Sequence, residues 1–173
     1  MSQPGKVVGG RDRLPPGGNA VEIKMVLDLP REAASVPVSR QVMDGCLEKL
    51  GVTPDTRTDI ALALSEACAN VVLHAAQTDE YEVLARVTNG RCVIEVVNKG
   101  GSGALAVPAA RRAALADGMV PVTAEHGRGL KIMDAVVDNL QLTGGRDGTT
   151  VHFEKDLDWV PGAAGEQLYA SER

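Results

Sequence analysis

The sequence predicts a two-layer α/β sandwich, in which a mixed, mainly antiparallel sheet of about five strands is covered by three helices. Three observations lead to this fold class. Apolar and polar residues alternate near the N-terminus, as in a strand with one buried face. Two apolar stripes with helical spacing follow. Pairs of β-branched and aliphatic runs, separated by short turns that contain glycine, then complete the pattern.

Length and composition set the limits of the interpretation. The 173 residues suffice for one compact core. Apolar residues make up 44% and aromatic residues only 2%, so the core must consist mainly of aliphatic side chains. The net charge of −5 argues against binding to nucleic acid. Because neither a secretion signal nor a membrane span is recognisable, we expect a cytoplasmic protein that does not bind membranes.

The first elements follow from periodicity and from stop signals. Residues 1–20 are rich in glycine and proline and predict a flexible arm. Strict alternation from Val21 to Leu29 predicts a strand. A helix is expected from Ser35 until Gly51 supplies a left-handed stop. Its expected buried stripe recurs every four residues: Val38, Val42, Cys46 and Leu50.

A second helix is predicted to start at Thr53 and Pro54 and to run to about Ala76. Runs at Tyr81–Thr88 and Arg91–Val97 flank Asn89-Gly90, a dipeptide that favours a tight hairpin turn. The two runs should therefore pair antiparallel. The same reasoning applies to the later elements, which are expected as follows: a lid at 103–126, a helix over Leu130–Val137, and strands at Leu140–Thr143 and Thr149–Leu157. The folded domain should span 21–157, with a loose tail at 158–173.

Glu66 and Asn70 lie four residues apart on the second helix, so their side chains should share one face. This face borders the expected apolar stripe. A carboxylate and an amide placed there could hold a hydrated Mg²⁺ and activate a hydroxyl group. Taken alone, the pair fits a solvated helix flank better than a site.

Three glycine-containing segments add candidate ligand contacts. The segment from Asn98 through Gly100 to Gly103 follows a strand, where a ligand can approach the backbone closely. Gly127-Arg128-Gly129-Leu130 leads into the third helix, whose free amides could bind an anion. Thr149 opens the last strand and could hydrogen-bond a base or merely satisfy the strand edge. Each segment alone also fits an ordinary loop or helix start.

The order and placement of these segments resemble a known family. The sequence L-S-E-A-C-A-N-V-V-L-H-A at Leu64–Ala75 resembles the N box of the histidine-kinase-like ATPase superfamily, whose ATP-binding domains have the Bergerat fold. The glycine segments resemble its G1 and G2 boxes, and Gly148-Thr149 resembles its final motif. Within that superfamily, the short chain and the stretch G-R-G-L-K-I-M-D-A-V-V-D-N-L are similar to the anti-sigma-factor serine kinases of bacteria.

The resemblance implies an ATP-binding and Mg²⁺-dependent protein serine/threonine kinase that regulates transcription. Glu66 would be the general base, and Asn70 would hold the metal. The nucleotide would be bound by Asn98, Gly100, Gly127, Arg128, Gly129, Leu130 and Thr149. The implied partners are a sigma factor, a STAS-type anti-anti-sigma protein that is phosphorylated on serine, and a second copy in a homodimer. Arg40 on the first helix is a candidate partner contact.

The G1 box departs from the family pattern at two positions. The family has aspartate where this chain has Asn98, and Ser102 replaces a glycine. A neutral amide oxygen can still accept a hydrogen bond, but a charge-assisted bond is about twice as strong. Weaker nucleotide binding is therefore expected. A catalytically weak or inactive binding module of the same fold remains the alternative, and an ATP-hydrolysing switch is a third class.

Overall fold

The computed structural model describes residues 22–74, 79–98, 126–145 and 148–170. Five strands form one sheet in the order β1-β2-β3-β5-β4, and each neighbouring pair is antiparallel. The predicted α/β class is thus confirmed, although the sheet is fully antiparallel over the described strands rather than mixed. The strands are β1 (Ile23–Pro30), β2 (Glu80–Thr88), β3 (Arg91–Asn98), β4 (Asn139–Gly145) and β5 (Gly148–Asp156).

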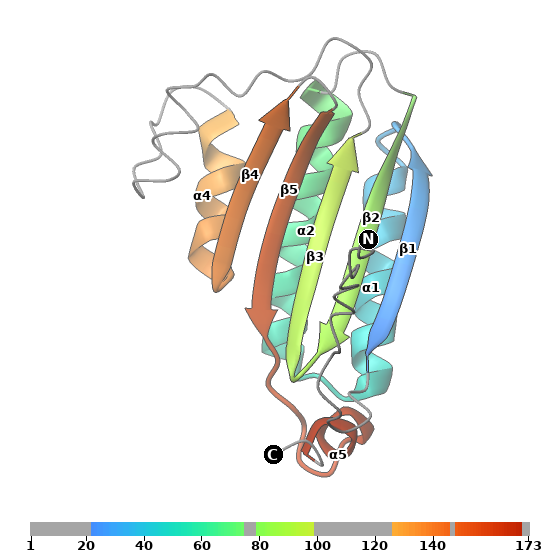
Figure 1. Ribbon diagram of the computed structural model, residues 1–173, viewed down its shortest axis with the longest axis vertical. Helices are drawn as coiled ribbons and strands as arrows, with labels where there is room; N and C mark the ends of the chain where they lie inside the picture. The colour runs from blue at the N-terminus through green and yellow to red at the C-terminus, as the bar shows by residue number, and fades with distance from the viewer. Residues whose placement is uncertain (1–21, 75–78, 99–125, 146–147, 171–173) are drawn as a thin grey trace, which may run out of the picture.

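Three of the helices in the described residues cover one face of the sheet, and Figure 1 shows this layer behind the strands. They are α1 (Ser35–Leu50), α2 (Pro54–His74) and α4 (His126–Val136). Helix α2 lies between the other two and packs against both. Among the described residues, no helix combines the length and the apolar character that crossing a bilayer requires.

The core lies between this helical layer and the sheet. Its residues are almost all aliphatic, as the composition predicts, and Ile60, Leu64, Val83 and Ile94 are fully buried. Phe153, the one phenylalanine in the sequence, is also buried and is 1% exposed. The close packing of these side chains holds α2 at a fixed position against the central strands.

The predicted apolar stripe of α1 is only partly buried: Leu50 packs against the core and Cys46 is half-buried, but the two valines are exposed. Val38 and Val42 are 48% and 41% exposed, whereas the buried side chains are one position further along the helix: Ser35, Ser39, Met43 and Leu47. Successive residues are about 100° apart on a helix, so a shift of one residue selects a different face. The two serines occupy core positions because their hydroxyl groups donate hydrogen bonds to backbone carbonyl oxygens, at 2.8 Å in each case.

Residues 159–170 do not form a loose tail. Helix α5 (Ala164–Ala170) lies at the end of the sheet where α1 ends and α2 begins (Figure 1). The rings of Trp159 and Tyr169 stack with centroids 5.7 Å apart, and the Tyr169 hydroxyl donates a hydrogen bond to the Val87 carbonyl oxygen. The backbone of Gly165 passes so close to Trp159 that a Cβ would lie 2.1 Å from the indole ring. These contacts fix α5 against the domain.

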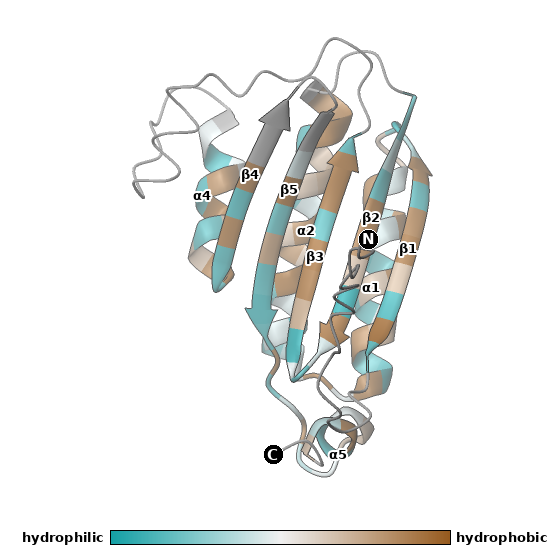
Figure 2. Cartoon of the chain, in the orientation of Figure 1, coloured by the Kyte–Doolittle hydropathy of each residue, from teal (hydrophilic) through white to brown (hydrophobic). Residues whose placement is uncertain are grey.

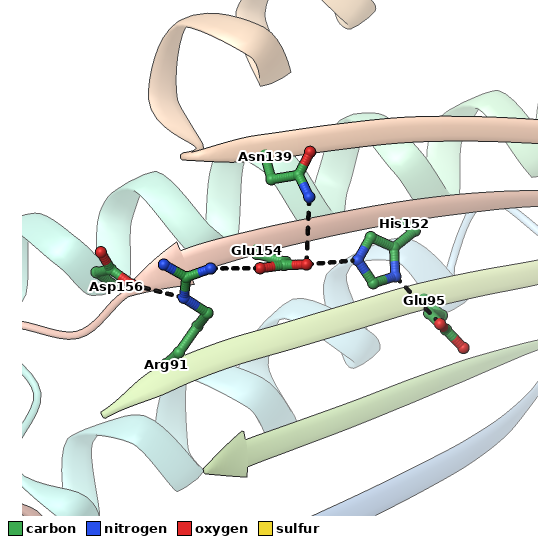
Figure 3. A network of polar contacts seen from close by, with 6 residues as sticks. All are labelled: Arg91, Glu95, Asn139, His152, Glu154 and Asp156. Carbon is green, nitrogen blue, oxygen red and sulfur yellow. Dashed lines mark hydrogen bonds and ion pairs between the residues drawn. The ribbon is translucent and has the colours of Figure 1, made fainter. Parts of the chain in front are cut away.

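The opposite face of the sheet, here called the open face, is not covered by any described helix (Figure 1). A polar network crosses it between β3, β5 and β4 (Figure 3). Arg91 binds Asp156 at 2.7 Å and Glu154 at 2.6 Å. The two ring nitrogens of His152 lie 3.0 Å from Glu154 and 3.1 Å from Glu95. The Arg91 guanidinium and the His152 imidazole thus contact the carboxylates of Glu95, Glu154 and Asp156.

This network makes stability depend on pH. Hydrogen bonds from His152 and Arg91 lower the pKa of the Glu154 carboxyl below its ordinary value of 4.5. The native state therefore keeps this carboxylate charged at pH values where the unfolded chain binds a proton. The stabilisation is complete above pH 4.5 and is lost as the pH falls through the lower folded value.

We expect Glu154→Gln to lower the unfolding free energy at pH 7 and to lose this effect on acidification. The measurement is urea unfolding of both proteins at a series of pH values from neutral to acid. A difference in unfolding free energy between the two proteins that stays constant across the acid range would contradict the role assigned to the charged Glu154 carboxylate.

Candidate functional site

The structure brings Glu66 of α2 against the start of α4. A Cβ built on Gly129 would lie 2.6 Å from Glu66 Oε2, so the carboxylate occupies the space that this glycine leaves free. Gly127 and Gly129 are both buried. Two sequence segments that lie some 60 residues apart in the chain therefore form one local site. Asn70, one turn further along α2, is half-buried, as Glu66 is.

Helix α4 begins four residues earlier than the sequence predicts. It starts at His126, so Gly127 and Gly129 lie in its first turn rather than in front of it. The first four amides of a helix have no partner within the helix, and the helix dipole places partial positive charge there. The close contact between Gly129 and Glu66 accordingly sets a carboxylate beside a helix terminus of the kind that can bind anions.

Asn98 and Thr149 are direct partners across β3 and β5. Asn98 ends β3 and is 1% exposed, with its side chain on the face of the sheet that α2 covers. Both strand termini lie at the same end of the sheet as the first turn of α4 and the C-terminal half of α2 (Figure 1). The residues predicted from three separate motifs thus share one end of the domain.

The remaining predicted site residues differ in how far their side chains are exposed, and some lie outside the described part of the chain. The Leu130 side chain is 3% exposed and belongs to the core, so it could touch a ligand only through its backbone. Arg128 on α4 and Arg40 on α1 are exposed. Gly100 and residues 103–125 of the predicted lid lie outside the described residues, whereas His126, the last residue assigned to the lid, begins α4.

A buried polar cluster beneath α2 was not predicted. Cys68, two residues from both Glu66 and Asn70, lies 3.5 Å from the Ser39 hydroxyl on α1. The hydroxyl groups of Tyr81 and Ser35 are 2.7 Å apart. Burial raises the pKa of both the Cys68 thiol and the Tyr81 phenol, so both stay protonated at neutral pH. The cluster fixes α1 against the side of α2 that faces away from the candidate site.

The donor atoms fit a weakly liganded magnesium ion. Mg²⁺ prefers oxygen ligands, keeps several waters, and is usually held by one or two protein side chains together with phosphate oxygens. Asn70 and Glu66 supply such oxygens on one helix face. The described residues hold no group of three or more histidine, cysteine or acidic side chains that could bind a metal without a ligand's help. One amide and one carboxylate are too few to hold Mg²⁺ alone, so waters and phosphate oxygens would complete its coordination.

Comparison with known proteins identifies the class. Residues 29–155 match the family described as the histidine kinase-like ATPase domain. This match covers most of the chain, and the chain therefore belongs to that family.

Within the family, the chain is similar to bacterial serine-protein kinases. It is 29% identical over 123 residues to the serine-protein kinase RsbW of Bacillus thuringiensis, covering 69% of this chain and 76% of that protein. It is 32% identical over 81 residues to RsbW of Bacillus cereus, covering 46% and 51%. A crystal structure of the RsbU and RsbW domains of a Mycobacterium tuberculosis protein shares the fold. Its TM-score is 0.59 at 20% identity, and the match covers 78% of this chain and 32% of that one.

Proposed function

We propose that this protein is an anti-sigma factor that binds MgATP and phosphorylates a serine of a STAS-type anti-anti-sigma protein. The observation that carries the proposal is the contact between the Glu66 carboxylate and Gly129, in the first turn of α4. It sets a potential general base beside a potential phosphate site. The similarity to RsbW serine-protein kinases supports the same reaction.

We infer the following reaction for this site. The γ-phosphate would bind the free amides at the start of α4, next to the Glu66 carboxylate, which fills the space beside Gly129. Glu66 would accept the proton of the partner's serine hydroxyl while its oxygen bonds to the γ-phosphorus. The bond to the bridging oxygen breaks, and ADP leaves. Bound Mg²⁺, held by Asn70, would neutralise charge that develops on the phosphate oxygens.

Specificity for adenine is assigned to the paired ends of β3 and β5. Asn98 faces the helical layer and lies opposite Thr149. The Asn98 amide oxygen can accept a hydrogen bond from the exocyclic amino group of adenine, and a threonine hydroxyl can donate or accept a second. Gly100 and the lid at 103–126 would complete the nucleotide site.

Asn98→Asp should tighten nucleotide binding, because a charge-assisted hydrogen bond replaces a neutral one. A gain of about 1 kcal/mol corresponds to roughly five- to tenfold higher affinity for ATP. The free protein should lose stability, since the new carboxylate is buried without the ligand. Isothermal titration calorimetry with ATP and thermal unfolding without it measure both effects. Equal or weaker ATP affinity in the variant would contradict the assignment of Asn98 to the adenine.

The direct test of the kinase function uses purified protein with MgATP and a STAS-domain protein encoded near it in the genome. We expect phosphate on one serine of that partner, detected by mass spectrometry, and release of a bound sigma factor from the complex. If calorimetry shows ATP binding but no candidate partner is ever phosphorylated, the kinase proposal fails. The cell compartment consistent with these partners is the cytoplasm.

The altered G1 box favours a second candidate, a partner-binding module of the same fold that transfers no phosphate. This module would bind a sigma factor equally well with and without nucleotide. Calorimetry separates the two functions. Absence of measurable ATP affinity in both the native protein and Asn98→Asp would favour the binding module.

A further inference from the structure

We propose that Lys155 positions the phosphate-binding end of α4, because it links the opposite end of that helix to α2. Lys155 is thus a positioning residue and does not itself touch the nucleotide. The inference rests on the proposed function for the role of the α4 amides. The link between the helices can be measured without any ligand, so the two proposals can fail separately.

Lys155 occupies an unusual place for a charged side chain. It lies on β5 two residues after the buried Phe153, and its direct partner on β3 is Cys92, which is 1% exposed. Side chains alternate between the two faces of a strand, so Lys155 lies on the same face as Phe153, toward the helical layer. Figure 2 shows the end of β5 as hydrophilic, whereas the neighbouring β3 is mostly hydrophobic. A charge in this position requires partners, because burying it unpaired is costly.

The ammonium group of Lys155 has two partners, one on each of two helices. It donates a hydrogen bond to the carbonyl oxygen of Val136, the last residue of α4, at 2.8 Å. It also forms an ion pair with Asp59 of α2 at 3.0 Å. The Lys155 side chain is 18% exposed, so these contacts are screened less than those of a surface ion pair. One side chain thus joins β5, α4 and α2.

The hydrogen bond to Val136 also completes the C-terminal end of α4. The last carbonyl groups of a helix have no partner within it, and the helix dipole places partial negative charge there. The last turn of α4, which the structure describes completely, contains no basic residue of its own. Lys155 therefore supplies, from a neighbouring strand, the cation that this helix end lacks.

The contacts at the two ends of α4 have matching positions on α2. Gly129 lies against Glu66 near the start of α4, and Lys155 joins Val136 to α2 at its end. On α4, seven residues separate Gly129 from Val136, and on α2 the same number separates Asp59 from Glu66. Seven residues make nearly two helical turns. Both contacts therefore lie on the same side of α2, about 10 Å apart along the helix.

Two separated contacts fix the direction of the α4 axis, whereas the contact at Gly129 alone would let the helix pivot. The amides of the first turn are assigned to the γ-phosphate, and a hydrogen bond weakens steeply when its donor is misaligned. Loss of the Lys155 contacts should therefore weaken the binding of the γ-phosphate. A displacement of about 1 Å at a reacting site can reduce the rate about 100-fold.

Lys155→Met in the full-length protein removes the ammonium group and keeps an apolar side chain of similar length. Affinity for ATP should fall by about tenfold, the loss expected when one hydrogen bond to a charged group is weakened. Affinity for ADP, which has no γ-phosphate, should change much less. Lys155→Arg keeps a cationic donor and should restore most of the ATP affinity. Isothermal titration calorimetry with each nucleotide measures these differences.

Hydrogen exchange of the free protein tests the link between the helices without nucleotide. The amides of α4 should exchange faster in Lys155→Met than in the native protein, while those of α1 should not change. Arg57→Met is the matched control, because Arg57 is 17% exposed and joins α2 to Asp44 and Glu48 of α1. This control removes the same charge. It should speed exchange in α1 instead and leave the ratio of ATP to ADP affinity unchanged.

Should Lys155→Met fail to fold, Asp59→Ala cuts the link at a side chain that is 37% exposed and should give the same changes in smaller size. Native exchange of α4 in these variants overturns the proposal. So does an unchanged ratio of ATP to ADP affinity, or an equal fall of that ratio in Arg57→Met. A native protein that binds no ATP refutes the proposed function and the phosphate role of α4 with it, whereas faster exchange of α4 would still support the link itself.

Discussion

Glu66→Gln should reduce the rate of phosphate transfer to the partner serine by about 100- to 10,000-fold, the range that general acid–base catalysis contributes. Glutamine has the same shape as glutamate and can keep the contact with Gly129, but it cannot accept the serine proton. Binding of ATP should change little, because the nucleotide is assigned to the amides of α4 and to Asn98. Single-turnover measurement of partner phosphorylation, combined with calorimetric titration of ATP, separates chemistry from binding.

Glu48→Gln is the matched control for this variant. Glu48 lies on α1, where its side chain is 58% exposed and pairs with Arg57. This substitution removes the same carboxylate chemistry at an exposed position on α1, which carries none of the residues assigned to the reaction. Phosphate transfer should remain at the native rate. If Glu66→Gln also retains the native rate, a different group accepts the serine proton and the role assigned to Glu66 is wrong.

Leu47→Ala should destabilise the protein by about 2–5 kcal/mol, whereas Val42→Ala should change the unfolding free energy by no more than about 0.5 kcal/mol. Leu47 is 1% exposed and belongs to the core, so its loss leaves a cavity. Val42 is 41% exposed, and alanine is also the better helix former. Urea unfolding of the two variants under identical conditions gives both values.

The comparison tests the orientation of α1 directly. The four-residue spacing of the sequence assigns Val42 to the core, and the structure assigns Leu47 instead. Val38→Ala, at a position 48% exposed, provides a second measurement on the exposed stripe and should behave like Val42→Ala. A large loss of stability in both valine variants with a small loss in Leu47→Ala would mean that the helix is rotated by about one residue.

Much of the fold could be predicted because local signals were strong. The Asn89-Gly90 turn between β2 and β3 has positive φ angles of 48° and 72°, as its type of hairpin requires. Gly51 ends α1 with a φ of 83° and donates hydrogen bonds back to the last turn. Such signals depend on a few neighbouring residues only. The orientation of α1 could not be predicted, because Ser35 and Ser39 look polar until their hydrogen-bond partners are known.

The position of the C-terminal helix α5 could not be predicted from local signals either. This seven-residue helix is too short to be stable alone, and the sequence has no strong periodic pattern that predicts it. It is ordered because Tyr169 reaches Val87 and stacks on Trp159, contacts that join residues far apart in the chain. Its position becomes predictable only when the end of the sheet against which it packs is known.

The sequence by itself determined the residue types of the candidate site, their order and the family to which the chain belongs, because these depend on motifs that are each short and local. Only the tertiary structure decided that the Glu66 carboxylate meets Gly129, that Asn98 lies opposite Thr149, and that a lysine of β5 joins the end of α4 to α2. Each of these is a relation between distant segments. Strand register and helix packing determine such relations, and burial of the whole core fixes both.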